Sequence, residues 1–123
     1  MKTAIVIFSD PVHGKDEALG RLFNALFLAL ELQEKQQEVE IVFQGAGTRW
    51  IGEIASPQHP AHPLYQALQE RIVICGGCAD IFDATARAET AAVRIIREKQ
   101  IPGTNGIVDL SRYLDQGARL LTF

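Results

Sequence analysis

The sequence predicts an α/β fold of three layers, with helices on both faces of a mostly parallel sheet of about five strands. Segments typical of strands and helices alternate along the 123 residues, as parallel sheets with right-handed crossovers require. The strand-like segments are apolar with almost no alternation, which is typical of strands buried on both faces. With 47% hydrophobic and 22% charged residues, the chain has enough apolar side chains for a core. We expect one domain, residues 1–123.

The N-terminal part of the chain predicts two strands and one long helix. Residues 2–8 form a β-branched run that a turn cluster, SDPVHG, follows. Between residues 15 and 37, leucines and phenylalanines recur at helical spacing, and acidic residues stand in the first turn, where the helix dipole favours them. Residues 39–43 predict the second strand.

The middle of the chain is a long connection that leads to a third strand. Within residues 44–63 we expect a short helix starting at Thr48 and then a proline-broken loop, residues 56–63. Residues 64–70 predict a short helix and residues 71–74 the third strand.

The C-terminal part predicts two helices and two strands. The spacing of alanines favours one long helix over residues 79–99. Residues 107–108 predict a short fourth strand, and residues 109–116 a helix that Gly117 ends. Residues 119–123 predict the last strand.

Charge and hydropathy narrow the class of protein. The net charge of −3 gives no electrostatic reason to expect nucleic acid or an anionic membrane as partner. The apolar run at residues 4–8 is too short for a signal peptide, and no stretch approaches the ~20 apolar residues of a membrane span. We therefore expect a cytoplasmic protein. In the reducing cytosol, two close cysteines are more often catalytic or metal-binding than a structural disulfide.

The only two cysteines, Cys75 and Cys78, stand where the third strand gives way to glycine. Cys75 is expected at the strand end and Cys78 in the first turn of the next helix, where unpaired N–H groups and the helix dipole favour thiolate over thiol. Gly76 and Gly77 would let a ligand approach the backbone closely. The pair is thus a candidate catalytic site.

Three alternatives remain open for these cysteines. In the first alternative, both cysteines are ordinary buried residues that pack as small apolar side chains. In the second, His59 and His62 join Cys75 and Cys78 in a tetrahedral zinc site. The third is a thioredoxin-like redox pair.

The loops at the carboxyl ends of the strands supply candidate binding residues, because ligands of parallel sheets bind at this edge. They are Ser9 in the first loop, and Gly45, Arg49 and Trp50 in the second. An arginine near the thiols would stabilise a thiolate or an anionic sulfur substrate. Three further arginines belong to the predicted long helix over residues 79–99, and we expect them on its solvated face: Arg87, Arg94 and Arg97.

Three stretches together, FQGAGTRW, CGGCA and GARLLTF, resemble the DsrE/DsrF-like family, and the similarity spans nearly the whole chain. The resemblance implies a parallel α/β/α fold, association into homo- or hetero-oligomers and, as in sulfur-relay members, a persulfide on Cys75. It places Cys78 at a position that need not be cysteine. Relay members often have Arg-Gly where this chain has Phe82-Asp83, so Asp83, with Asp80 nearby, is expected to oppose the thiolate.

The sequence therefore favours a sulfur carrier or sulfurtransferase that takes up sulfur on Cys75, with Cys78 as resolving or second thiol. A donor or acceptor protein is the expected partner, and no cofactor is required. The alternative is a non-catalytic ligand-binding or assembly module, with or without the zinc site.

Overall fold

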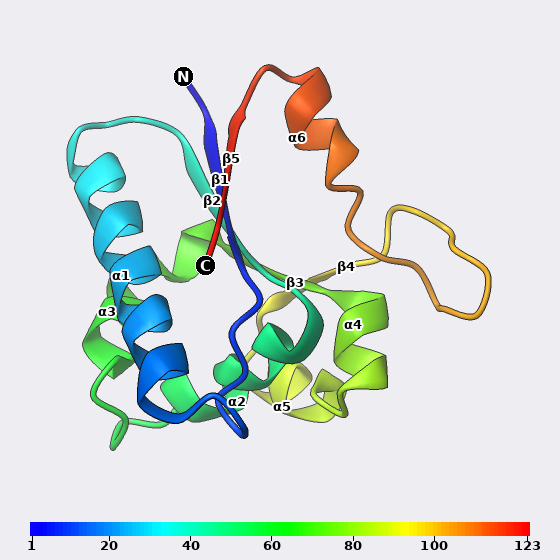
Figure 1. The fold of residues 1–123 in the computed structure, drawn as a ribbon, viewed down its shortest axis with the longest axis horizontal. Coiled ribbons are helices and arrows are strands. Elements are labelled where there is room, and N and C mark those ends of the chain that lie inside the picture. The colour runs from blue at the N-terminus through cyan, green and yellow to red at the C-terminus, as the bar shows by residue number, and fades with distance from the viewer.

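The computed structural model describes residues 1–123 and contains one five-stranded sheet (Figure 1). The strands are β1 (Thr3–Ile7), β2 (Val39–Phe43), β3 (Ile72–Cys75), β4 (Arg94–Ile96) and β5 (Arg119–Thr122). Their order is β4-β3-β2-β1-β5, and every neighbouring pair is parallel. The predicted α/β fold with a parallel sheet of about five strands is confirmed.

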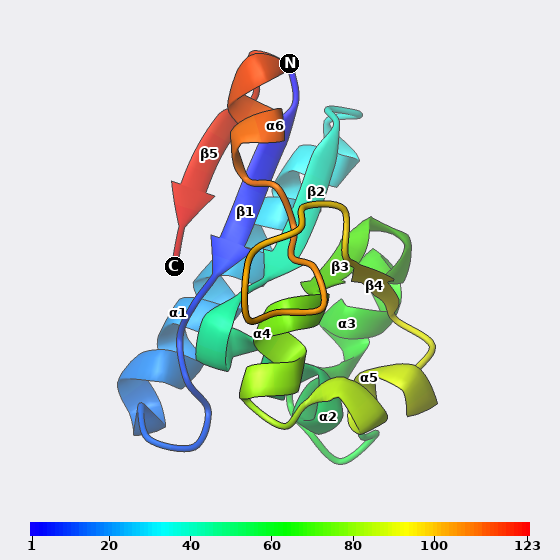
Figure 2. The same ribbon diagram turned by 90° about the vertical axis from the view of Figure 1, so that its right-hand side faces the viewer.

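Helices cover both faces of the sheet (Figures 1 and 2). The α-helices are α1 (Lys15–Glu34), α2 (Trp50–Ile54), α3 (His62–Leu68), α4 (Gly76–Ile81), α5 (Thr85–Thr90) and α6 (Ser111–Asp115), and the 3₁₀ helices are η1 (Gly45–Arg49) and η2 (Gln69–Arg71). Side chains of α1, α2, α3 and α5 pack into one core cluster, and α6 packs into another. No helix is long and apolar enough to cross a membrane.

The two clusters lie on opposite faces of the sheet because successive strand residues point to opposite sides. Ile72 and Ile74 of β3 belong to the larger cluster under α1, which we call the α1 face. Val73 and Cys75 belong to the smaller cluster under α6, the α6 face. Both faces are apolar, as the continuous hydrophobic runs predict, and Cys75 is on the α6 face.

The predicted long helix over residues 79–99 is wrong. The segment forms α4, α5 and β4 instead, with Asp83 (φ 56°) and Ala92 (φ 58°) in the left-handed conformation that ends each helix. The isoleucines near its end belong to an edge strand beside β3. Alanine spacing alone did not distinguish one helix from two short helices and a strand.

The predicted fourth strand at residues 107–108 is also wrong, because Ile107 makes only one antiparallel bridge, to Lys99. The fourth strand of the sheet is β4. The short helix before the last strand is confirmed as α6, where Asp109 accepts the Ser111 N–H at 3.1 Å. Gly117 (φ 71°) follows this helix, as predicted.

Candidate functional site

Cys75 lies where the sequence placed it, at the end of β3 and immediately before α4. Its side chain is fully buried at 0% exposure, whereas Cys78, in the first turn of α4, is partly exposed. Both cysteines are free thiols. The pair therefore consists of an inner, fully buried cysteine and an outer, partly exposed one.

The inner sulfur is surrounded by hydrogen-bond donors. The Cys78 S–H is the strongest of them, and the backbone N–H groups of Val108, Cys78 and Gly77 add to it. Together they outweigh the opposing effect of burial and lower the pKa of Cys75 to about 6. Such donors stabilise the charged form of a thiol, so Cys75 is the sulfur of the pair on which a thiolate is favoured.

Cys78 shows the opposite behaviour. Its proton is held in the hydrogen bond to Cys75, and burial further disfavours a second negative charge, so its pKa is strongly raised even though the Gly45 N–H donates to its sulfur. One proton is thus shared by two sulfurs, with Cys75 as acceptor and Cys78 as donor. Gly45, a predicted binding residue, does lie at the thiol pair.

A segment from Arg97 to Val108 covers the start of α4, and we call it the covering segment (Figure 2). Gly106 O accepts the Gly77 N–H at 2.8 Å, and the Lys99–Ile107 bridge closes the segment's base. A Cβ on Gly77 would lie 2.7 Å from the Ile107 side chain. This glycine thus admits the covering segment, and the predicted role of Gly77 in ligand binding stays a prediction.

Arg97 is the residue whose place the sequence prediction missed most clearly. It is not on a solvated helix face: its side chain lies across Gly76, where a Cβ would be 2.5 Å from Arg97 Cγ. The guanidinium forms two hydrogen bonds with Asp80, at 2.8 and 3.0 Å, and the pKa of Asp80 falls to about 2 because of them. The charge of Asp80 is therefore paired, so the predicted opposition of Asp80 to the thiolate is largely cancelled.

Gln44 is a second residue that the sequence did not single out. The register pairs Phe43 with Ile74, and Gln44 is extended, so its backbone stands beside Cys75 and its side chain is on the same α6 face. Gln44 is 8% exposed, and its Oε1 has no hydrogen-bond partner in the protein. Buried acceptors are rarely left unpaired, so the Gln44 amide is an acceptor available on this face of the sheet.

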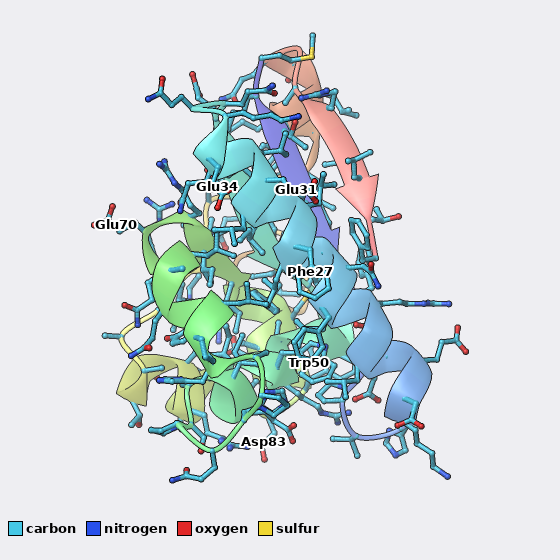
Figure 3. The ribbon with its side chains drawn as sticks, turned by 90° about the vertical axis from the view of Figure 1, so that its left-hand side faces the viewer. Phe27, Glu31, Glu34, Trp50, Glu70 and Asp83 are labelled. Carbon is cyan, nitrogen blue, oxygen red and sulfur yellow. The ribbon has the colours of Figure 1, made fainter.

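The other predicted binding residues do not join the thiols. The indole of Trp50 is buried in the α1-face cluster and donates to Ser9 O at 2.8 Å and to Ser9 Oγ at 3.2 Å (Figure 3). Arg49 contacts Asp10 and Phe82. These three residues stabilise the loops at the carboxyl ends of the strands. Arg49 also lines a separate cleft that contains neither cysteine.

The alternative zinc site does not assemble. Histidines 59 and 62 pack beside Trp50 and Tyr65, residues of the α1-face cluster, whereas both cysteines are on the α6 side. The His62 Nδ1 contacts Ile54 O at 2.8 Å, and the His59 Nδ1 accepts the Ala61 N–H. No cluster of three or more metal-ligating side chains exists in the chain, as expected when the histidines and the cysteines lie on opposite faces of the sheet.

Comparison with known proteins agrees with the fold and leaves the chemistry open. An uncharacterised protein of Methanocaldococcus jannaschii, MJ0733, is 30% identical over 121 residues, which cover 98% of this chain and 94% of that protein. A solved structure, a conserved protein of unknown function from Bacteroides thetaiotaomicron (BT1422), superposes with a TM-score of 0.63. It is 16% identical, and the match covers 99% of this chain and 94% of that one.

The family comparison covers every residue that the structure describes. Residues 1–123 match the model of the DsrE/DsrF-like family, and the parallel sheet has helices on both faces, as the sequence resemblance implied. The chain therefore belongs to the DsrE/DsrF-like family.

Proposed function

We propose that this protein is a cytoplasmic sulfur carrier that holds sulfane sulfur as a persulfide on Cys75. The observation on which the proposal depends is the set of donors around the Cys75 sulfur, which lowers its pKa to about 6. Thiolate, not thiol, is the nucleophile in sulfur exchange. Membership of the DsrE/DsrF-like family supports the same chemistry.

The proposed uptake step exchanges one sulfur–sulfur bond for another. The Cys75 thiolate attacks the terminal sulfur of a donor persulfide, a Cys75–sulfur bond forms, and the donor leaves as thiolate. No oxidant or reductant is consumed. Delivery reverses the step: an acceptor thiolate attacks the terminal sulfur, and Cys75 leaves as thiolate, the form its neighbours stabilise.

Cys78 provides a second route by which the stored sulfur can leave Cys75. Its thiol is hydrogen-bonded to Cys75, so after losing its proton it can attack the inner sulfur of the persulfide. A Cys75–Cys78 disulfide then forms and hydrosulfide leaves with the terminal sulfur. This attack needs the Cys78 thiolate, so the discharge should be slower at lower pH.

Burial of Cys75 requires that the site opens during loading. The covering segment is the movable wall, because it is tied to α4 through the Gly77–Gly106 hydrogen bond and through the exposed Arg97–Asp80 pair. Exposed ion pairs contribute only about 0–1 kcal/mol, so the Arg97–Asp80 pair holds the segment weakly, whereas Val108 at its end is anchored in the α6-face cluster.

Intact mass after incubation with a persulfide donor tests the proposal. We expect the wild type to gain about 32 Da, one sulfur. Cys75→Ser should gain nothing, because the acceptor thiolate is gone. Cys78→Ser should still gain the adduct and hold it longer, because the discharging thiol is gone.

The same experiment has a matched control and a clear failure. Arg97→Gln releases the tie to Asp80 while keeping both cysteines, so its uptake should be faster than that of the wild type. Uptake by Cys75→Ser, or none by the wild type, would show that Cys75 is not the carrier.

Self-association is part of the proposed function, with the open edge of β5 as the contact. β5 pairs only with β1, so one row of its backbone groups is unpaired. Leu121 on this strand is an apolar side chain with 39% exposure, and Phe27 on the outward side of α1 is 47% exposed (Figure 3). Leu121 thus places an exposed apolar side chain on the strand with the free edge.

We expect sedimentation at micromolar concentration to give a mass above one chain. Leu121→Asp should reduce it to one chain, since a charge in an apolar contact is costly. Leu114→Asp is the matched control, because Leu114 is 58% exposed but belongs to α6. A wild-type mass equal to one chain would remove self-association from the proposal and leave the sulfur chemistry untouched.

A further inference from the structure

A cavity of about 250 Å³ lies outside the thiol site, between the loop after β1, helix α2 and the α4–α5 junction. Its charged lining residues are Arg49, Arg87, Glu53 and Asp83, and its apolar lining includes Val12 and Phe82. All three walls follow the carboxyl ends of strands, where ligands of parallel sheets bind. Neither cysteine lines the cavity.

Arg87 is the side chain in this cavity with the most unused hydrogen-bond donors. Its Nη2 donates to Gly52 O at 2.7 Å, and no carboxylate lies within ion-pair distance. The side chain crosses α2 directly over Gly52, where a Cβ would be 2.2 Å from Arg87 Nε. A glycine at this position therefore lets the guanidinium lie along the cavity wall.

Arg49 provides a second cation with loose contacts. Its Nη1 lies 3.3 Å from each Asp10 oxygen, and its Nε lies 3.4 Å from Phe82 O. The guanidinium also lies 5.3 Å from the centre of the Phe82 ring. Long bonds of this kind leave donors that a planar carboxylate can take with better geometry.

Two carboxylates on the lining have no cationic partner. Glu53 and Asp83 make no ion pair in the structure, although both share the cavity with Arg49 and Arg87. The lining thus has two positive and two negative side chains. A balanced lining disfavours a bare polyanion such as phosphate and suits a ligand with one charge of each sign.

We propose that this cavity binds a small zwitterion of the amino-acid class. The ligand carboxylate lies against Arg87 and Arg49, its ammonium group against Glu53 and Asp83, and its side chain on Val12 and Phe82. The cavity is smaller than the roughly 300–1,000 Å³ of drug-sized sites, which fits a single amino acid. This binding is independent of the persulfide chemistry proposed for Cys75.

An NMR titration of the labelled full chain with the standard free amino acids, each at millimolar concentration, tests the proposal. We expect at least one to bind saturably and to shift the resonances of Arg87 and Phe82. For the tightest of them, the matching amine without the carboxylate and the matching acid without the ammonium should each bind about tenfold more weakly, since each loses a hydrogen-bonded charge.

Variants locate the site. Arg87→Gln should weaken binding about tenfold or more, and Gly52→Ala should also weaken it, because the added Cβ displaces the Arg87 side chain without removing its charge. Arg94→Gln, an exposed arginine of β4 outside the cavity, should bind like the wild type. Unchanged melting temperatures show that each variant is folded.

Three results would overturn the proposal: no saturable binding by any amino acid, unchanged binding in Arg87→Gln, or equally tight binding of the amine or acid analogue. Cys75→Ser should bind like the wild type. Loss of persulfide uptake with retained amino-acid binding therefore separates the two proposals.

Discussion

Replacing Gly47 with alanine is expected to lower the free energy of unfolding by about 3 kcal/mol, at the upper end of overpacking effects. Gly47 is buried in η1, and a Cβ there would lie 2.1 Å from Ile7 O and 2.9 Å from Ile7 C. The Ile7 carbonyl cannot easily move away from the added Cβ. Ile7 ends β1, which is paired on both sides, and its carbonyl accepts the Gln44 N–H at 3.0 Å.

The matched control is Gly20→Ala, the same chemical change with the opposite expected sign. Gly20 is inside α1 and has no heavy atom within 4 Å of its added Cβ. Alanine there should stabilise the protein by about 0.5–1 kcal/mol through helix propensity. Urea unfolding followed by circular dichroism measures both. If Gly47→Ala is as stable as the wild type, η1 does not pack against β1 as described.

This glycine also shows why the sequence predicted the fold better than the site. The apolar runs of the strands and the helical spacing of apolar residues in α1 are local patterns. Four strands were therefore predicted within one or two residues: β1, β2, β3 and β5. The need for glycine at 47 depends on a carbonyl forty residues away in the chain. No local pattern reports a contact of that kind.

The errors in the site have the same origin. Cys75 and Cys78 were placed correctly because a strand end and a helix start are local features. Arg97 was misplaced because its partner, Asp80, lies seventeen residues away and the intervening segment turns twice at residues with positive φ. Gln44 was overlooked because only the register of β2 against β3 places it beside Cys75. The histidines were joined to the cysteines because their spacing matched, although the sheet separates them.

Replacing Cys78 with alanine is expected to raise the pKa of Cys75 from about 6 towards the ordinary thiol value. The Cys78 S–H is the largest cause of the lowered pKa, and the backbone N–H groups remain in the variant. At pH 7 the wild type is mostly thiolate, whereas the variant should be mostly thiol. Thiolate ultraviolet absorbance against pH measures this change without requiring access to the buried sulfur.

Cys78→Ser is the matched control, because the serine hydroxyl can still donate to the Cys75 sulfur. Its titration should lie between those of the wild type and Cys78→Ala, and closer to the wild type. If Cys78→Ala titrates like the wild type, the backbone groups alone set the thiolate, and Cys78 has no part in activating it.

The same pKa predicts how stability depends on pH. A thiol whose pKa is lower in the folded than in the unfolded chain stabilises the fold above the unfolded value, and this stabilisation is lost as the pH falls through the folded value. The free energy of unfolding should therefore rise from about pH 6 to about pH 9. Cys78 has a raised pKa and acts in the opposite direction above that window. In Cys78→Ala the rise between pH 6 and 9 should largely disappear, because the folded and unfolded pKa values of Cys75 converge, and denaturant unfolding at several pH values would detect the loss.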